Sequence, residues 1–289
     1  MKHTFKFLAL GITVSTMALM SCGGNSEKPA QTNESTPAET AAPQAAESSV
    51  DEMVEFKFHY LTANIPSPME LVDALPQAGI AFNKEVLNAI ENESKYNTSL
   101  QKALNFGVYS VDMAYLTTNE QFAMVKPYLN TSRNLAKSLD LAETFDKVVG
   151  NRLSQNSENK DSLKKVIDEA YYEVDNYMRN NERALAATQM LTGSWIESQY
   201  ITLMLIKDEA KSDKNAMLFA KIFEQKRHLA SLVSLLKEYE KEKAFKPLID
   251  QIYELNKLYD AMKTEDASNK DFLNKLATAV GKVRASIIK

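Results

Sequence analysis

Glycine and proline are scarce over most of this 289-residue chain. From Glu55 to Lys289 there are only five of each in 235 residues, and Ala, Leu, Lys and Glu dominate. A β-sandwich of this length needs many more turn residues, whereas these residue types favour helices. We therefore predict an all-α fold, a bundle of about ten helices, that occupies residues 55–289 as the folded domain.

Several helix starts can be recognised. Ser67-Pro68-Met69-Glu70 has the pattern of a capping box with Pro at the first helical position. Asn83, Asn159 and Asn269 are each followed by Lys and an acid, which places a cap before a negative charge in the first turn. Pro247 can open a further helix. The predicted helices are 68–75, 84–92, 99–117, 120–139, 141–155, 160–179, 181–208, 213–241, 246–262 and 270–288.

Two local patterns add to this scheme. Residues 56–60, Phe-Lys-Phe-His-Tyr, alternate like a short strand. Pro127 falls within the fourth predicted helix, which it should kink or interrupt.

The chain begins with a predicted export signal. Lys2 and Lys6 precede an apolar stretch, residues 7–20, which is shorter than the ~20 residues that span a bilayer and has the size of a signal-peptide core. The stretch ends in Leu19-Met20-Ser21-Cys22, which resembles the lipobox read by lipoprotein signal peptidase. We expect residues 1–21 to be removed and Cys22, the single cysteine, to carry diacylglyceryl and N-acyl (palmitate-type) chains. The alternative is an ordinary secretory signal with a chance cysteine.

Residues 22–54 predict a disordered tether behind the lipid. The segment has no aromatic residue and cannot bury enough apolar area to offset its ordering entropy. It has six acids and one lysine, a net charge of −5, whereas the mature chain carries −6 once two lysines leave with the signal. The folded part is therefore nearly neutral, which argues against a nucleic-acid surface. Fully stretched, the tether could reach on the order of 100 Å.

Two helical segments resemble each other. Residues 107–115 read Gly-x-aromatic and then Asp-x-x-Tyr, and residues 193–200 read Gly-x-aromatic and then Glu-x-x-Tyr. Two related helical halves packed about a pseudo-twofold axis would explain this, and chance similarity between amphipathic helices is the alternative. Because Gly in a helix interior costs about 1 kcal/mol relative to Ala, Gly107 and Gly193 predict close helix approach or room for a ligand.

The same segments hold the candidate ligand-binding residues. An acid and a Tyr three positions later lie on one helix face. If both faces turn inward, they line one polar pocket. Alternatively, the acids hold buried Tyr hydroxyls or pair with Arg183 or lysines, or they form a catalytic carboxylate pair, for which the sequence fixes no separation. The candidates are Tyr109, Asp112, Tyr115, Trp195, Glu197 and Tyr200.

Signatures of metal sites and of familiar catalysis are missing from the sequence. The mature chain has two histidines, His59 and His228, and no free cysteine. Glu224 and His228 lie one helical turn apart and could share an ion, but no second pair accompanies them. There is neither a Gly-x-Ser-x-Gly elbow nor a phosphate-binding glycine loop. We expect no metal, no cofactor and no catalytic residue.

The overall pattern resembles helical lipoproteins of Bacteroidetes-type bacteria. The resemblance is carried by Ser21-Cys22-Gly23-Gly24, by residues 105–115 and by residues 193–200. It covers most of the folded domain loosely and implies no activity. In some of these bacteria, acidic residues just after the Cys direct lipoproteins to the cell surface, and Gly23-Gly24-Asn25-Ser26 departs from that. We therefore expect the outer membrane, facing the periplasm.

Taken together, these features predict a tethered envelope lipoprotein. Its expected role is a non-catalytic binding or scaffold module, attached to the membrane through its lipid, for an envelope protein or a small molecule. A hydrolase that uses paired carboxylates and a purely structural envelope spacer are the alternatives.

Overall fold

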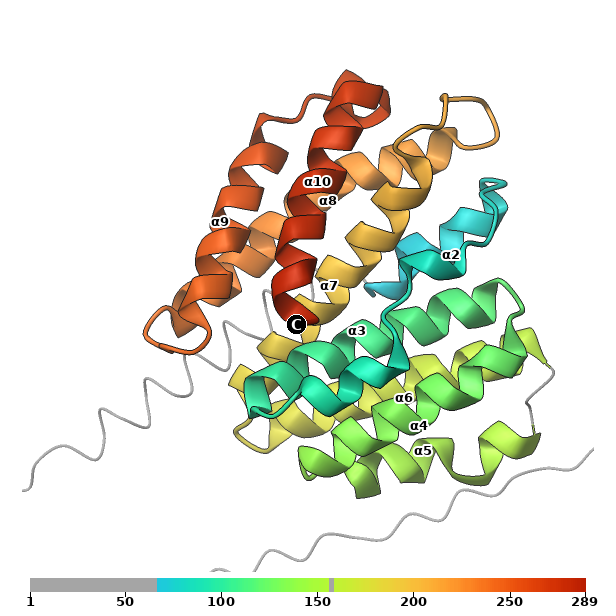
Figure 1. Ribbon diagram of the computed structural model, residues 1–289, viewed down its shortest axis with the longest axis vertical. Helices are drawn as coiled ribbons and strands as arrows, with labels where there is room; N and C mark the ends of the chain where they lie inside the picture. Colours follow the sequence, from blue (N-terminus) through green and yellow to red (C-terminus); the bar gives the residue numbers. More distant parts are fainter. Residues whose placement is uncertain (1–66, 156–158) are drawn as a thin grey trace, which may run out of the picture. The chain divides into compact units, whose positions relative to one another are not determined.

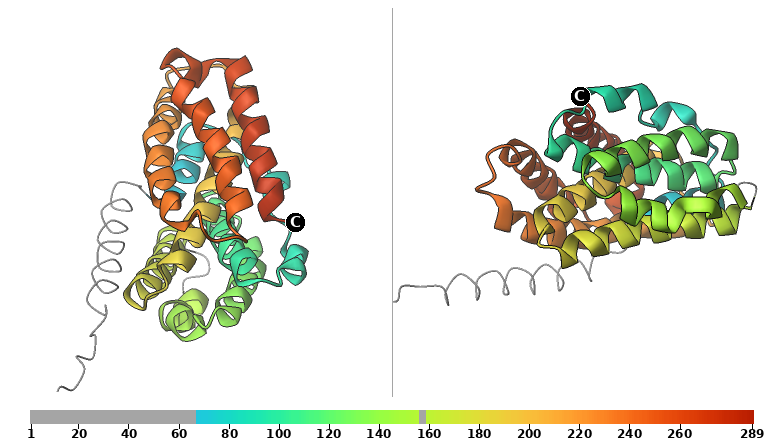
Figure 2. Two further views of the ribbon diagram at one scale, coloured as in Figure 1. Left: turned by 90° about the vertical axis from the view of Figure 1, so that its left-hand side faces the viewer. Right: turned by 90° about the horizontal axis from the view of Figure 1, so that it is seen from below.

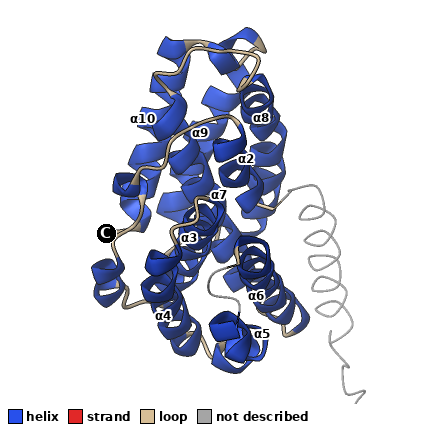
Figure 3. Cartoon of the chain, turned by 90° about the vertical axis from the view of Figure 1, so that its right-hand side faces the viewer, coloured by secondary structure: helices blue, strands red, loops and turns tan. Residues whose placement is uncertain are grey.

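The computed structural model describes residues 67–155 and 159–289, all within one unit, residues 44–289. In these ranges the chain forms nine α-helices and four short 3-10 helices, and no strand (Figures 1 and 3). The all-α prediction is confirmed. The predicted signal peptide, tether and 56–60 strand lie outside the described residues. The α-helices are α2 (Met69–Gln77), α3 (Ser99–Thr118), α4 (Phe122–Ser138), α5 (Ala142–Gln155), α6 (Lys160–Asn180), α7 (Ala184–Ile206), α8 (Ala216–Leu236), α9 (Lys246–Ala261) and α10 (Lys270–Ile287).

Helices α3 and α7 pack against each other at the centre of this arrangement. α4 and α6 pack on α3, and α5 packs on α4 and α6. α10 packs on α7 from the other side and contacts α9, which contacts α8 (Figures 1 and 2). Most residues of α3 and α7 are buried, as expected for helices with apolar or small residues all round. Within the described part, no helix is both long and apolar enough to cross a bilayer.

Three asparagine caps act as predicted. The Asn159 side chain accepts a hydrogen bond from the backbone N–H of Ser162 (2.9 Å), and Asn269 does the same for Phe272 (3.0 Å). The Asn83 side chain accepts from Glu85 N (2.9 Å). Pro247 stands in the first turn of α9, as expected. Each cap pairs a donor that a helix start leaves free.

The α-helix predicted over residues 84–92 is wrong. The chain forms two 3-10 helices there, η1 (Lys84–Val86) and η2 (Ile90–Lys95), separated by extended backbone at Leu87 and Ala89. Tertiary contacts explain the difference, because buried donors and acceptors elsewhere in the fold bond to the backbone of residues 86–89. We call residues 83–96 the α2–α3 connection.

Two other local predictions are corrected. Ser67 forms no capping box, since its Oγ accepts from Met69 N (3.4 Å) and the Glu70 carboxylate pairs with Lys221 instead. Pro127 does not interrupt α4, which continues to Ser138. Pro127 is near the start of the helix, and the carbonyl that it leaves without a donor belongs to exposed Ala123, where water can replace the bond.

Four helices end in the same compact turn. In each, one residue adopts positive φ, and the next donates its N–H to a carbonyl five residues back, the hydrogen bond of a Schellman motif. After α2 the positive-φ residue is Gly79, where the conformation carries no steric penalty. After α3, α4 and α6 it is Glu120, Asp140 and Glu182, at φ of 59°, 57° and 58°. Each of these three residues has a Cβ and therefore bears the steric cost of a left-handed backbone conformation.

Replacing Glu182 with Gly should therefore stabilise the protein by about 0.5–1 kcal/mol, the left-handed penalty less the extra entropy of Gly in the unfolded chain. Glu182 is exposed, so little packing is lost. Urea unfolding measures the gain. Glu182→Ala keeps the Cβ and serves as the control, and an equal gain from Ala would show that backbone strain is not the cause.

Candidate functional site

The two glycines of the repeated pattern bring α3 and α7 into backbone contact. A Cβ at Gly107 would lie 2.1 Å from the carbonyl oxygen of Met190, and a Cβ at Gly193 would lie 1.9 Å from that of Leu104. Each of these carbonyls stands three residues before the facing glycine, so the crossing is locally symmetric. Of the two predicted roles for these glycines, the structure shows close helix approach.

Glu197 of α7 forms a buried ion pair with Arg284 of α10. Arg284 Nε and Nη2 donate to the two carboxylate oxygens at 2.6 and 2.7 Å. Glu197 has no exposed surface and Arg284 is 6% exposed. The guanidinium lies over the Tyr200 ring, 4.0 Å from its centroid, and Nη2 also donates to the Val86 carbonyl (3.1 Å). A bidentate pair with these extra bonds is the geometry in which a buried charge is best compensated.

Asp112 of α3 lies beside this ion pair and is also fully buried. Its Oδ2 accepts the backbone N–H of Asn88 (3.2 Å), and its carboxyl lies within hydrogen-bonding reach of Glu197. Burial, reinforced by the negative charge of Glu197, raises the pKa of Asp112 well above its usual value, against the smaller opposing effect of Arg284. These surroundings therefore favour the protonated form of the Asp112 carboxyl.

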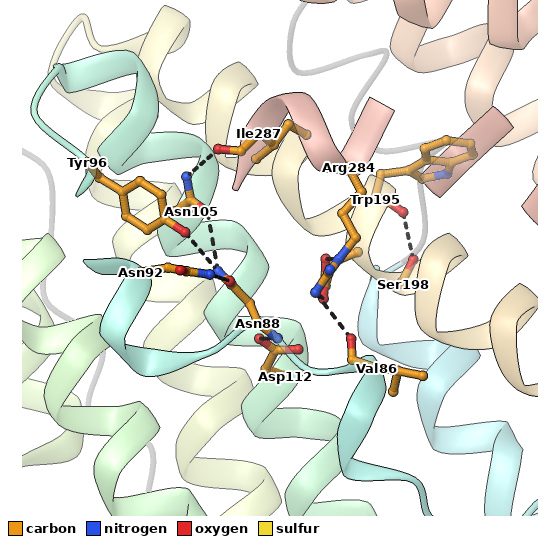
Figure 4. Close-up of polar contacts among 11 residues, drawn as sticks. Val86, Asn88, Asn92, Tyr96, Asn105, Asp112, Trp195, Ser198, Arg284 and Ile287 are labelled. Carbon is orange, nitrogen blue, oxygen red and sulfur yellow. Dashed lines mark hydrogen bonds and ion pairs between the residues drawn. The ribbon is translucent and has the colours of Figure 1, made fainter. Parts of the chain in front are cut away.

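The tyrosines of α3 hold the α2–α3 connection. The Tyr109 hydroxyl donates to the Ala89 carbonyl (2.8 Å), and Tyr115 accepts from the backbone N–H of Asn83 (2.9 Å). Asn105 completes this polar layer by donating to the Ile287 carbonyl at the end of α10 (3.0 Å; Figure 4). Tyr109, Tyr115 and Asn105 are thus bonded to neighbouring backbone rather than turned toward a ligand cavity.

Trp195 belongs to a different polar cluster. Its indole N–H donates to Gln225 of α8 (3.2 Å), and Gln199 donates to the same oxygen (2.9 Å). The Tyr259 hydroxyl donates to Gln199 (2.9 Å), and its ring meets the indole edge-on at 5.7 Å. Figure 4 shows Trp195 on the opposite side of Arg284 from Asn88 and Asp112. This cluster joins α7 to α8 and α9.

A small cleft borders Trp195 where α2, α7 and α8 meet. Its volume of about 10 Å³ is the space that roughly one water molecule needs. His228 lines it and is 4% exposed, and burial, more than the nearby charge of Arg227, lowers its pKa, so it is neutral. In the ranges that the structure describes, no three His, Cys, Asp or Glu side chains are placed to hold a metal ion. The lining residues are Ser67, Pro68, Glu70, Leu71, Trp195, Ser198, Lys221, Glu224, Gln225 and His228.

The six candidate residues therefore do not share one pocket. Asp112 and Glu197 do come together, with Tyr200 beneath the Arg284 guanidinium, while Tyr109 and Tyr115 reach the α2–α3 connection and Trp195 faces α8. The suggested partner Arg183 is wrong for both acids, because its Nη2 donates to the Leu139 carbonyl (2.8 Å). Cys22 lies outside the described residues.

Sequence reasoning missed the residue that organises the site, Arg284. A signal was present, since Arg284 interrupts the apolar face of α10 between Val280 and Ile287. A charge on such a face is either paired or costly. Asn88 gave no comparable signal, because its role depends on its backbone N–H.

The chain matches no protein-family model, no curated protein and no solved structure.

Proposed function

We propose that this chain is a lipid-anchored helical lipoprotein of the bacterial envelope and acts as a non-catalytic binding or scaffold module. The observation that carries the non-catalytic part is the burial of the two candidate acids. Neither Asp112 nor Glu197 has exposed surface, and both carboxylate oxygens of Glu197 accept hydrogen bonds from Arg284. A general acid, base or nucleophile must come within hydrogen-bonding distance of its substrate, and these two carboxyl groups are closed off from one.

A hydrolase that uses the same carboxyl pair is the competing proposal, favoured only by the proximity of Asp112 to Glu197. The two proposals differ in what the conservative double replacement Asp112→Asn with Glu197→Gln does. If the protein is a hydrolase, any hydrolytic activity found with envelope glycosides, esters or peptides is abolished in the double variant. If it is a binding module, no activity depends on these residues.

Partner binding in this proposal uses the surface of the bundle, because the cleft at Trp195 has room for only about one water molecule. Large apolar side chains reach solvent at Tyr172 of α6 and Met217 of α8, which are 59% and 70% exposed. A purely structural spacer would need no particular surface. Exchanging residues 67–289 for an unrelated helical domain behind the same residues 1–66 separates the two roles: a spacer still restores a deletion strain, and a binding module does not.

Anchoring through Cys22 is tested directly by Cys22→Ala. We expect wild-type protein in the outer-membrane fraction with incorporated palmitate label, and the variant unlabelled, because the acyl chains that give stable anchoring are attached at Cys22. Ser26→Ala is the matched control and should stay in the membrane. Protease added to intact cells should leave the wild-type protein uncut if it faces the periplasm. Palmitate label in the Cys22→Ala variant, or its absence from the wild-type protein, would overturn the anchor.

A further inference from the structure

Two carboxyl groups and one guanidinium share a space that is closed to solvent. Glu197 takes both charge-assisted bonds that Arg284 gives to carboxylates. Asp112 is left without a cation of its own, although it has no exposed surface. A second buried negative charge costs far more than a buried neutral acid that keeps its hydrogen bonds. Charge balance in this cluster therefore favours a proton on Asp112.

The hydrogen bonds point to the same proton. Asp112 Oδ2 has a donor, the Asn88 N–H, but no donor among the described residues reaches Oδ1. The carboxylate of Glu197 lies within hydrogen-bonding reach of Asp112, but it can only accept. A proton on Asp112 turns two facing acceptors into a donor and an acceptor. It also gives Asp112 Oδ1 a hydrogen bond, without which this buried atom would bear the full cost of desolvation.

This cluster holds the α2–α3 connection through hydrogen bonds to the backbone of two nearby residues, Asn88 and Val86. Asp112 accepts the N–H of Asn88, and Arg284 donates to the carbonyl of Val86 (Figure 4). The Tyr109 hydroxyl holds the next carbonyl, that of Ala89. Leu87 and Ala89 have extended backbone, so the segment lacks the continuous hydrogen bonding of a helix. Three backbone groups of residues 86–89 are bonded instead by Asp112, Arg284 and Tyr109.

We propose that Asp112 acts as a proton-operated latch that holds residues 86–89 of the α2–α3 connection against α3 and α10 and releases them when it gives its proton to solvent. In the closed state the Asp112 carboxylic acid donates to the Glu197 carboxylate. On opening, the proton passes to water or buffer, and both groups become carboxylates. Their mutual repulsion and the hydration of Asp112 then favour the open connection. This inference goes beyond the proposed scaffold function and does not depend on it.

The other charged and titratable groups near Asp112 do not supply the same switch. Arg284 stays charged, because its pKa is raised by Glu197 even against desolvation by burial. The pKa values of the nearby tyrosines are raised by burial, so they stay neutral. Asp73 and Lys164 pair with each other, and Asp73 meets α3 at Thr118 (2.5 Å). The groups facing Asp112 are Glu197 on α7, Arg284 on α10, Tyr128 on α4 and Tyr109 on α3, while Tyr96 on the connection accepts from the Asn88 side chain.

The sign of the effect follows from linkage. The pKa of Asp112 is raised in the folded protein, so the closed state binds more protons than the opened one. Its stabilisation is complete below the unfolded pKa of about 3.9 and is lost as pH rises from there toward the folded pKa. One proton released on opening makes the opening equilibrium tenfold more favourable for each pH unit in that window.

Hydrogen exchange of the purified wild-type protein between pH 5 and 9 tests the latch. After correction for the intrinsic exchange rate, protection of the Asn88 amide should fall by up to tenfold per pH unit. The amide of Ile252 on α9 is the reference. If it exchanges through an opening that leaves Asp112, Glu197 and Arg284 in place, its protection should stay nearly constant over this pH range. Equal pH dependence at both amides would overturn the latch. Because this measurement uses the wild-type chain, it does not depend on any variant folding.

Two variants sharpen the result. Asp112→Asn copies the protonated acid permanently, since its carbonyl oxygen can accept from Asn88 and its amide can donate to Glu197. In this variant, Asn88 protection should lose its pH dependence. Asp146→Asn removes a half-buried acid that is bonded to Arg133. Arg133 lowers the pKa of Asp146, so Asp146 does not titrate in this range. This variant should retain the wild-type slope. An unchanged slope in Asp112→Asn would assign the proton to another group and overturn the proposal.

Discussion

Replacing Arg284 with Met should destabilise the folded protein by about 3–5 kcal/mol at neutral pH. The substitution keeps an apolar stem over Tyr200 but removes the donors to Glu197 and to the Val86 carbonyl. Glu197 would be left as an uncompensated charge without exposed surface, which is the costly way to break a buried pair. Urea unfolding followed by the fluorescence of Trp195, the only tryptophan, measures the loss.

The matched control for Arg284→Met is Arg133→Met. Arg133 also forms a bidentate bond to a carboxylate, Asp146, at 2.6 Å for both contacts, but this pair is exposed. Water and salt screen such pairs, so the control should unfold at nearly the wild-type urea concentration. Similar small losses for both variants would mean that the Glu197–Arg284 pair contributes no more than a surface contact.

Replacing Gly193 with Ala should cost about 3 kcal/mol, at the upper end for overpacking. The added Cβ would lie 1.9 Å from the Leu104 carbonyl oxygen and 2.8 Å from its carbon. Both atoms are backbone of α3, so no side-chain rotation relieves the clash and the two central helices must separate. Thermal unfolding measures the loss, and Gly107→Ala should behave alike because its Cβ meets the Met190 oxygen at 2.1 Å.

Gly281→Ala should have the opposite effect on the stability of the folded protein. A Cβ at Gly281 would lie 3.7 Å from the Tyr200 ring, an ordinary contact. Alanine in the interior of α10 should therefore stabilise the protein by about 0.5–1 kcal/mol. If Gly193→Ala were as well tolerated as Gly281→Ala, the backbone contact between α3 and α7 would not be needed for stability.

Helix positions were predictable wherever local chemistry decides them. The caps at Asn159 and Asn269 satisfy donors within their own helix, and the apolar stripe of α9 repeats at helical spacing. The segment 84–92 has a similar start at Asn83, but its backbone is bonded by Asp112, Tyr109 and Arg284. Those partners lie elsewhere in the sequence, and no local pattern reveals them.

The candidate site was predictable in part. Gly107 and Gly193 lie where α3 and α7 cross, and an acid follows each glycine by four or five residues. This arrangement brings Asp112 close to Glu197. Trp195 was assigned to the same pocket, although it stands two positions before Glu197, and residues at that spacing do not share a helix face. The cation partner required the tertiary fold, because Arg284 lies 87 residues after Glu197.

Unfolding free energies of a double-mutant cycle test most directly whether these buried acids serve the fold. The cycle combines Glu197→Leu with Arg284→Met and is measured in urea at neutral pH. If the pair is a structural lock, each single variant loses several kcal/mol, while the double variant, with apolar residues in both places, returns to within about 1–2 kcal/mol of wild type. Losses that simply add in the double variant would show that Glu197 and Arg284 do not act together, and would contradict the structural role assigned to them.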